Sequence, residues 1–516
     1  MVNRFIKIAS TVFILSLLFS SLISAPRPVQ AGTYTVNTLN DSHDSSPGDG
    51  TCDDGSGHCS LRAAIEEGNS WPTSEINFSV DGTILTTNGT MTINKMTHIN
   101  GNGPTRTIVD GQSTSDLFYS DTITGGGEDA FVSFSNIKIT NGKPGVYVKK
   151  GYVRFTNVVF QANNNLLGNG GAISCSDLTS KISIFGGSFL SNNAVNGGAI
   201  HSICSIIIEK FDGKGTLFRS NTTDGNGGAI YFSGKKMVLK DAYFDQNVAT
   251  FHGGGIYFTA GDMTSGNIID NVVLISNEAK GSGGGIYHVQ YDLAITDSSI
   301  SRNKAVNGGG IYTASYLEIE NTTIGENHAS NSGGGIYNKS GSLELSSVSI
   351  VGNIADFGDD GDGNGGGIFQ ESGTIYMRNS ILAKNEDDSG GEFGITAPDC
   401  LGTITSEGYN LVGAVTPGQC NVTGDLVGLQ KGTKNSPLDP QLDVFDEDTY
   451  FTPFFPIFQD SRVIDAGNPA GCMNADGVLL PEDQHGELRK AGYACDLGAV
   501  ESPYSTWRVY LPLLIR

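Results

Sequence analysis

An internal repeat constrains the fold of this chain more than any other feature. One marker is Gly-Gly-(Gly/Ala)-Ile, usually followed by Tyr or Phe, and a second is an apolar residue, two variable residues and Asn. The isoleucines are Ile173, Ile200, Ile230, Ile256, Ile286, Ile311, Ile336 and Ile368. The asparagines are Asn163, Asn192, Asn221, Asn247, Asn277, Asn303, Asn327, Asn353 and Asn385. Two independent markers that keep step over about 220 residues indicate a stack of equivalent units.

The repeating unit is built from strands. The region is rich in Gly, Ser, Thr and Asn, which disfavours a helical solenoid, and a propeller would have longer blades of roughly 40 residues. Alternating apolar runs, such as 316–320 and 342–346, predict short strands with one buried face. We therefore predict an all-β fold, a right-handed parallel β-helix over residues 76–425. Its coils would stack about 4.8 Å apart, so that equivalent Asn side chains hydrogen-bond from coil to coil and Gly clusters permit tight corners.

The paired markers also resemble a known repeat. Residues 189–192 (Phe-Leu-Ser-Asn) and 197–200 (Gly-Gly-Ala-Ile) are complete examples, and together they resemble the repeats of chlamydial-type polymorphic outer-membrane proteins. Members of that family are β-helical surface adhesins. The resemblance thus implies the same fold and a role in adhesion at a cell surface.

The N-terminal part predicts export and a cap. Residues 1–31 combine a charged start, an apolar stretch and a small-residue cleavage site, which predicts a signal peptide, with a membrane anchor as the alternative. No other segment is apolar enough for long enough to cross a bilayer. Residues 32–75 are expected to cap the solenoid, with a short helix that Ser60 begins and Gly68 ends. The stretch 59–69 resembles the CSLREA module at the start of bacterial secreted β-helix proteins, with Ala63 in place of the usual Glu.

The C-terminal part resembles a second module. Motifs at 438–442, 463–467, 483–489 and 495–501 occur in the order typical of the choice-of-anchor Q-type domain, which precedes varied surface-anchoring tails. We therefore expect a C-terminal domain over residues 426–502. The tail at 503–516 is interpreted either as a sorting tag or as a strand that packs on the last coil.

Eight cysteines after an export signal favour disulfides, although buried free thiols and, more weakly, zinc are alternatives. The local pairs are Cys52–Cys59, Cys175–Cys204, Cys400–Cys420 and Cys472–Cys495. Cys175 and Cys204 each lie 12 residues after an Asn marker, and that register predicts stacked neighbours within disulfide range. The isoleucine register would instead offset them by two residues.

The charge of the chain limits its partners. The formal net charge is −23, and it becomes −26 without residues 1–31, so we expect no nucleic-acid partner. Divalent cations are favoured, and alternating Asp and Gly in the loop 356–364 suit Ca²⁺. The candidate ligands, with a solvated acidic loop as the alternative, are Asp356, Asp359, Asp360 and Asp362. We expect a secreted or cell-surface monomer.

An aromatic residue follows most corner isoleucines. These residues are Tyr231, Tyr257, Tyr287, Tyr312, Tyr337 and Phe369. Alternation along a strand points each Ile inward and each ring outward. Stacked outward rings stabilise the coils, or they form a platform for a polysaccharide or another cell-surface ligand.

A search for catalytic groups finds no convincing set. A glycosidase on this fold needs paired carboxylates on adjacent coils with a nearby His or Arg. The NTD and RIK signatures of polygalacturonase-type hydrolases are absent, Arg219 and Arg302 are interpreted as solvated turn residues, and His252 as a corner residue. We therefore predict a non-catalytic adhesion or binding module. A polysaccharide lyase or glycoside hydrolase and a structural envelope spacer are the alternatives.

Overall fold

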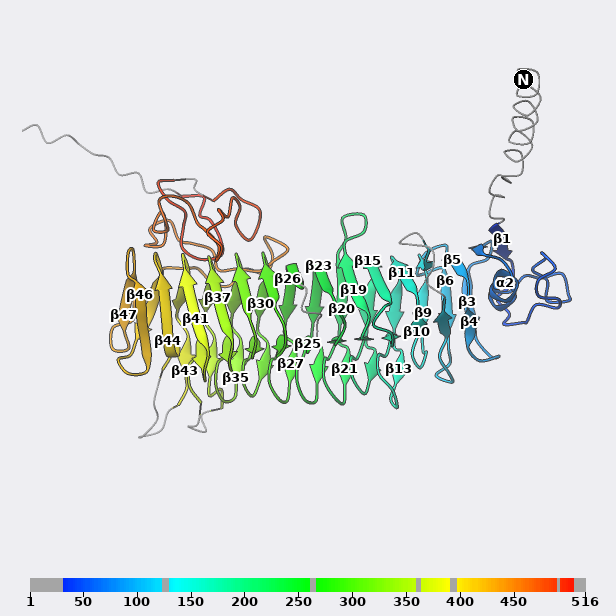
Figure 1. The fold of residues 1–516 in the computed structure, drawn as a ribbon, viewed down its shortest axis with the longest axis horizontal. Helices are drawn as coiled ribbons and strands as arrows, with labels where there is room; N and C mark the ends of the chain where they lie inside the picture. Colours follow the sequence, from blue (N-terminus) through cyan, green and yellow to red (C-terminus); the bar gives the residue numbers. More distant parts are fainter. Residues whose placement is uncertain are drawn as a thin grey trace, which may run out of the picture.

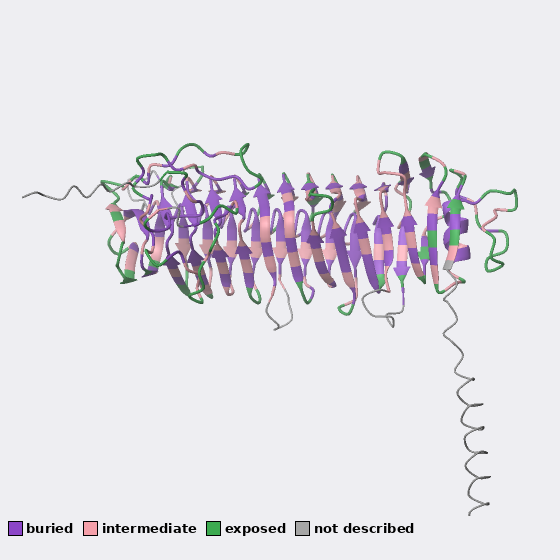
Figure 2. Cartoon of the chain, turned by 90° about the horizontal axis from the view of Figure 1, so that it is seen from above, coloured by how far each residue is buried: buried purple, intermediate pink, exposed green. Residues whose placement is uncertain are grey.

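The computed structural model describes residues 31–122, 130–259, 266–358, 363–389, 397–489 and 492–504. The predicted signal peptide (except Ala31), the tail from residue 505, and Asp359, Asp360 and Asp362 therefore lie outside the described residues. The chain winds into a long parallel β-helix, as the repeat predicts (Figure 1). One hydrophobic core runs along the inside of the rod, and the exposed positions lie on its outer faces and turns (Figure 2).

The coils build three parallel sheets, which we name A, B and C. Sheet C consists of β13 (Asn164–Asn165), β17 (Asn193–Ala194), β21 (Thr222–Thr223), β24 (Val248–Ala249), β27 (Glu278–Ala279), β31 (Lys304–Ala305), β35 (His328–Ala329), β39 (Ile354–Ala355) and β43 (Glu386–Asp387). Sheet B consists of β4 (Met91–Ile93), β7 (Phe118–Asp121), β10 (Val146–Lys150), β14 (Ile173–Cys175), β18 (Ile200–Ser202), β22 (Ile230–Phe232), β25 (Ile256–Phe258), β28 (Ile286–His288), β32 (Ile311–Thr313), β36 (Ile336–Asn338), β40 (Ile368–Gln370) and the start of β44 (Cys400–Glu407).

Sheet A has two rows of strands, because most coils bend once within it. The first row is β1 (Ala31–Val36), β2 (Thr73–Phe78), β5 (Met96–Asn100), β8 (Val132–Ser135), β11 (Tyr152–Thr156), β15 (Lys181–Phe185), β19 (Ser205–Glu209), β29 (Leu293–Thr296), β33 (Leu317–Glu320), β37 (Ser342–Ser346), β41 (Thr374–Arg378), the end of β44 and β46 (Cys420–Asp425). The second row is β3 (Gly82–Leu85), β6 (Thr107–Asp110), β9 (Lys138–Thr140), β12 (Val159–Gln161), β16 (Ser188–Leu190), β20 (Thr216–Arg219), β30 (Ser299–Ser301), β34 (Thr323–Gly325), β38 (Ser349–Val351), β42 (Ile381–Ala383), β45 (Leu411–Val415) and β47 (Gln430–Thr433). Two strands, β23 (Met237–Asp245) and β26 (Ile268–Ile275), span both rows.

The Asn markers form a buried ladder at the corner between sheets A and C. The Oδ1 atom of Asn277 accepts hydrogen bonds from the backbone N and the Nδ2 of Asn247, at 3.1 and 2.8 Å. Its own Nδ2 donates to the carbonyl oxygen of Phe244 at 3.0 Å. The ladder ends at Asp399, whose Oδ1 accepts hydrogen bonds from the backbone N and the Nδ2 of Asn385, the last Asn marker. Burial raises the pKa of the Asp399 carboxyl to about 7. The ladder thus gives the buried Asn side chains of the marker hydrogen-bond partners from coil to coil.

A short helix covers the N-terminal end of the core. Helix α2 (Leu61–Gly68) begins where the Ser60 hydroxyl accepts a hydrogen bond from the Ala63 backbone N at 3.0 Å, as predicted. Arg62 forms a buried ion pair with Asp41 at 2.8 Å, which fixes the helix to the preceding loop. The buried helical residues that close the core are Leu61, Ala64 and Ile65. A polar loop and a helix therefore replace an exposed strand edge at this end.

The eight cysteines form the four predicted disulfides. The register argument for Cys175, however, was wrong. Strands β14 and β18 pair in the isoleucine register, so Cys175 lies opposite Ser202. Cys204 reaches it from the turn that follows β18, because the chain bends back there before β19 begins.

Residues 434–504 form a subdomain of loops and isolated antiparallel bridges that lies along sheet A over the C-terminal half of the rod (Figure 1). Its apolar residues make a second core with outward-facing residues of the rod. Arg489 is buried and donates to Asn321 Oδ1 at 2.8 Å, while Thr323 Oγ1 donates to Gln484 Oε1 at 2.7 Å. Several residues of the C-terminal sequence motifs thus act as docking contacts.

Candidate functional site

The predicted aromatic residues form one continuous ladder on sheet B. Neighbouring ring centroids from Tyr231 to Phe369 lie 4.8 to 5.1 Å apart, and each pair is stacked. The corner isoleucines are buried, whereas the rings are half-buried. Because each inner ring uses both faces to contact its neighbours, the ladder presents ring edges and hydroxyl groups to solvent.

Two histidines belong to this ladder and were missed by the sequence analysis. His201 follows Ile200 at the same corner position and stacks on Tyr231 at 4.8 Å. His252, which was interpreted as a corner residue, stacks on Tyr287 at 4.5 Å and accepts a hydrogen bond from the Ser282 backbone N. The position after the corner isoleucine was a sufficient signal for His201, but no repeat marker points to His252.

The chemistry of the ladder is that of neutral hydroxyl groups. Burial raises the pKa of Tyr287 to about 12, so the phenol stays protonated at physiological pH. At the C-terminal end, the Tyr337 hydroxyl donates to Glu371, which in turn pairs with Lys339. The ladder therefore offers a row of uncharged donors and acceptors along the axis of the rod, and these can contact hydroxyl groups of an elongated ligand.

Of the predicted calcium ligands, the structure describes Asp356 alone. Its side chain is fully buried and its backbone φ is 55°, so it lies inside the corner that precedes the Gly marker. Within the described ranges, no three His, Cys, Asp or Glu side chains are arranged so that they could hold a metal ion. The calcium site remains a prediction from the sequence.

A carboxylate cluster, which the sequence analysis also missed, lies on sheet A beneath the subdomain. Glu318 and Glu320 project from β33, and Glu344 lies opposite Glu318 on β37. Arg378 on β41 forms ion pairs with Glu344, at 3.7 Å, and with Glu407. Burial and the neighbouring Glu318 carboxylate raise the pKa of Glu320 to about 7. Acids and an arginine thus converge across adjacent coils, which is one part of what a glycosidase on this fold would need.

The subdomain approaches this cluster closely. The Asn474 side chain lies near enough to Glu320 to oppose the rise in its pKa, and the Asp476 charge contributes to the raised pKa of Glu318. The side chains of Glu344 and Arg378 are only 14% and 11% exposed. We infer that the cluster mainly affects the stability of the contact between the rod and the subdomain, because its carboxylates repel one another there.

This arrangement predicts a pH-dependent junction. The folded-state pKa of Glu320 is above its unfolded value, so its contribution to stability is greatest at low pH and is lost as the pH rises through about 7. Glu320→Gln should therefore raise the midpoint of thermal unfolding at pH 8 and change it little at pH 4. Calorimetry at both pH values measures this, with Glu209→Gln, in the same outward row of sheet A but outside the cluster, as the control. Equal effects at pH 4 and pH 8 would contradict the account.

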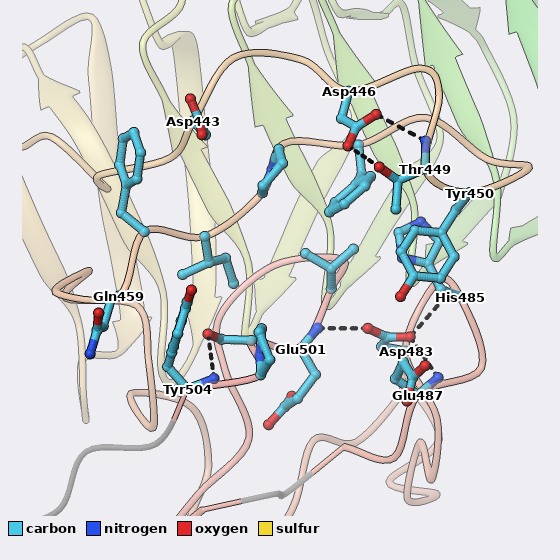
Figure 3. A pocket seen from close by; sticks show the side chains of 17 residues that line it. Asp443, Asp446, Thr449, Tyr450, Gln459, Asp483, His485, Glu487, Glu501 and Tyr504 are labelled. Atoms are coloured by element: carbon cyan, nitrogen blue, oxygen red, sulfur yellow. Dashed lines mark hydrogen bonds between the residues drawn. The ribbon is translucent and has the colours of Figure 1, made fainter.

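The subdomain contains a cavity of about 480 Å³ (Figure 3). Several carboxylates line it, but they already hold backbone groups. Asp483 accepts from the backbone N of His485, Glu487 and Glu501, at 2.7 to 3.0 Å. The rings of Tyr450 and His485 stack at 4.0 Å, and burial lowers the pKa of the imidazole. These contacts order the loops around the cavity.

Comparisons with known proteins agree with this architecture. The Chlamydia polymorphic membrane protein repeat matches residues 215–233, which include the Asn221 and Ile230 markers. The probable autotransporter YfaL of Escherichia coli (strain K12) is 33% identical over 174 residues, and the match covers 30% of this chain and 14% of that protein. This chain therefore spans a small part of that relative. No solved structure matches it. The chain is a parallel β-helix with one short match to this repeat. None of its described helices is long and apolar enough to span a membrane.

Proposed function

We propose that this chain is a secreted or cell-surface module that binds carbohydrate or another cell-surface ligand without cleaving it. The observation that carries the proposal is the aromatic ladder, a half-exposed stripe of stacked rings from His201 to Phe369 along one sheet. Stacked rings alone would stabilise the coils. A half-exposed row of phenols in addition resembles binding surfaces, in which Tyr is enriched.

Three further features support a surface location. All eight cysteines are paired, as is typical of proteins in oxidising compartments. The matched repeat takes its name from a membrane protein, and the matched relative is a probable autotransporter.

The ladder proposal predicts the effect of removing two neighbouring rings. Tyr287→Ala combined with Tyr312→Ala should weaken retention on a glycan or on cells at least roughly tenfold, because Tyr is enriched among the interface residues whose truncation costs about 2 kcal/mol or more. Tyr119→Ala combined with Tyr147→Ala is the matched control, since these rings also stack on sheet B, at 5.5 Å, but outside the ladder. Circular dichroism must show that both variants fold. Unchanged binding by the first variant would overturn the ladder proposal.

A further inference from the structure

A cationic aromatic cluster lies on the outer face of sheet A, near the N-terminal end of the rod. We name it the Arg154 patch, and it consists of Phe131, Tyr152, Arg154, Lys181 and Phe185. The guanidinium carbon of Arg154 lies 4.2, 5.4 and 5.7 Å from the ring centroids of Phe131, Phe185 and Tyr152. The Lys181 Nζ lies 4.9 Å from the Tyr152 ring. Three rings therefore hold one guanidinium group at a fixed place on the sheet.

Arg154 and Arg462 are the two arginines of the described ranges for which no ion pair with a described carboxylate is found. Six of the eight arginines in the described ranges form ion pairs with carboxylates, namely Arg62, Arg106, Arg219, Arg302, Arg378 and Arg489. Arg154 forms no ion pair with any described residue, and its one hydrogen bond there is from Nη2 to the Tyr152 hydroxyl at 3.2 Å. Its Nε is buried and has no hydrogen-bond partner among the described residues. A half-buried cation that pairs with no described carboxylate can gain free energy from an anionic ligand.

The local charge favours such a ligand. Residues 130–185 hold six Lys or Arg residues and one acid, Asp177, whereas the whole chain has a formal net charge of −23. Asp121, Glu128 and Asp129 come just before this stretch, and Glu209 lies beside Phe185 in the strand register. The basic residues are Lys138, Lys143, Lys149, Lys150, Arg154 and Lys181. A positive region on an otherwise acidic rod attracts anions locally, whereas the rod as a whole repels a dense polyanion such as nucleic acid.

Polar groups on neighbouring coils complete the patch. Ser133 and Ser183 lie directly beside Arg154 in the strand register, and His98 continues the same outward row. The Ser133 hydroxyl contacts His98 Nδ1 at 2.9 Å, and the Ser183 hydroxyl accepts from Tyr152 at 3.1 Å. The row thus places hydroxyl groups on both sides of a guanidinium that can bind a carboxylate through two parallel hydrogen bonds.

We propose that the Arg154 patch binds a carboxylate-bearing sugar of an acidic polysaccharide, with Arg154 on the carboxylate and the aromatic edges against the sugar ring. This inference rests on the proposed carbohydrate-binding function, but it names a different surface and a substrate class. Strands β11 and β15, which carry Arg154 and Lys181, lie outside the half of the rod that the subdomain covers (Figure 1).

The test measures the affinity of the mature chain for immobilised polygalacturonate. Arg154→Gln should weaken the apparent Kd at least roughly tenfold, because one charge-assisted pair is lost. Lys181→Gln should weaken it less, and rising NaCl should weaken binding of the unmodified chain. Arg219→Gln is the matched control, since Arg219 also lies on sheet A but pairs with Asp245 at 2.7 Å. Circular dichroism must show native folding of each variant.

The comparison ligands separate this inference from the ladder proposal. Methyl-esterified polygalacturonate, dextran sulfate and single-stranded DNA should each bind more weakly than polygalacturonate. Loss of polygalacturonate binding by Arg154→Gln but not by the double Tyr287/Tyr312 variant would support the patch and count against the ladder. Unchanged binding by Arg154→Gln would overturn the patch, and so would equally tight binding of the ester, the sulfate or the DNA.

Discussion

Gly284→Ala is expected to prevent folding of the central coils or to lower the free energy of unfolding by at least about 3 kcal/mol. A Cβ atom at this position would lie 2.3 Å from Gly309 O and 2.6 and 2.7 Å from the backbone O and N of Lys304. These are backbone atoms of the next coil, so no side chain can move aside. Urea unfolding followed by circular dichroism measures the loss.

The adjacent glycine supplies the control. At Gly285 a Cβ would lie 2.8 Å from Gly310 O and at least 3.2 Å from its other neighbours. Alanine occupies the equivalent position at Ala172, Ala199 and Ala229, where it is buried. Gly285→Ala should therefore cost about 1 kcal/mol or less. If the two variants lose the same free energy of unfolding, crowding by backbone atoms is not the reason why the second position of the marker is glycine.

Asn277→Ala is expected to lower the free energy of unfolding by roughly 3 kcal/mol or more, because it leaves several buried polar groups unsatisfied at once. The change removes the acceptor for two donors of Asn247 and the donor to the carbonyl oxygen of Phe244. It also removes the bond from Nδ2 to Asn303 Oδ1 at 2.9 Å. The exposed Asn435 provides the control, since Asn435→Ala should change stability by less than about 0.5 kcal/mol. A similar loss for both variants would mean that the ladder contributes little.

The sequence was sufficient for the coil architecture because its markers report local constraints. Each Asn marker follows a residue with positive φ, such as Ser276 at 56° or Arg302 at 53°, and each corner Ile is buried. These requirements repeat in every coil, so spacing alone reveals them. The pairing of Cys175 with Cys204 was predicted from the wrong register, because the turn after β18 is not part of the repeat.

The remaining site residues could not be found from spacing, because they meet through tertiary contacts. Glu318 and Glu320 are ordinary outward residues of an alternating strand until the subdomain, more than 150 residues later, places Asn474 beside them. Arg302, interpreted as a solvated turn residue, pairs with Glu326 and with Glu447 of the subdomain. The Arg154 patch likewise joins residues of three coils that no motif connects.

The central claim, binding without cleavage, is tested most directly by one incubation. The purified mature chain is mixed with acidic and neutral polysaccharides, with and without Ca²⁺, and both retention and new reducing or unsaturated ends are measured. The account predicts retention of at least one polysaccharide and no new ends. New ends would contradict it, and their loss in Glu320→Gln would place a catalytic site at the carboxylate cluster beneath the subdomain.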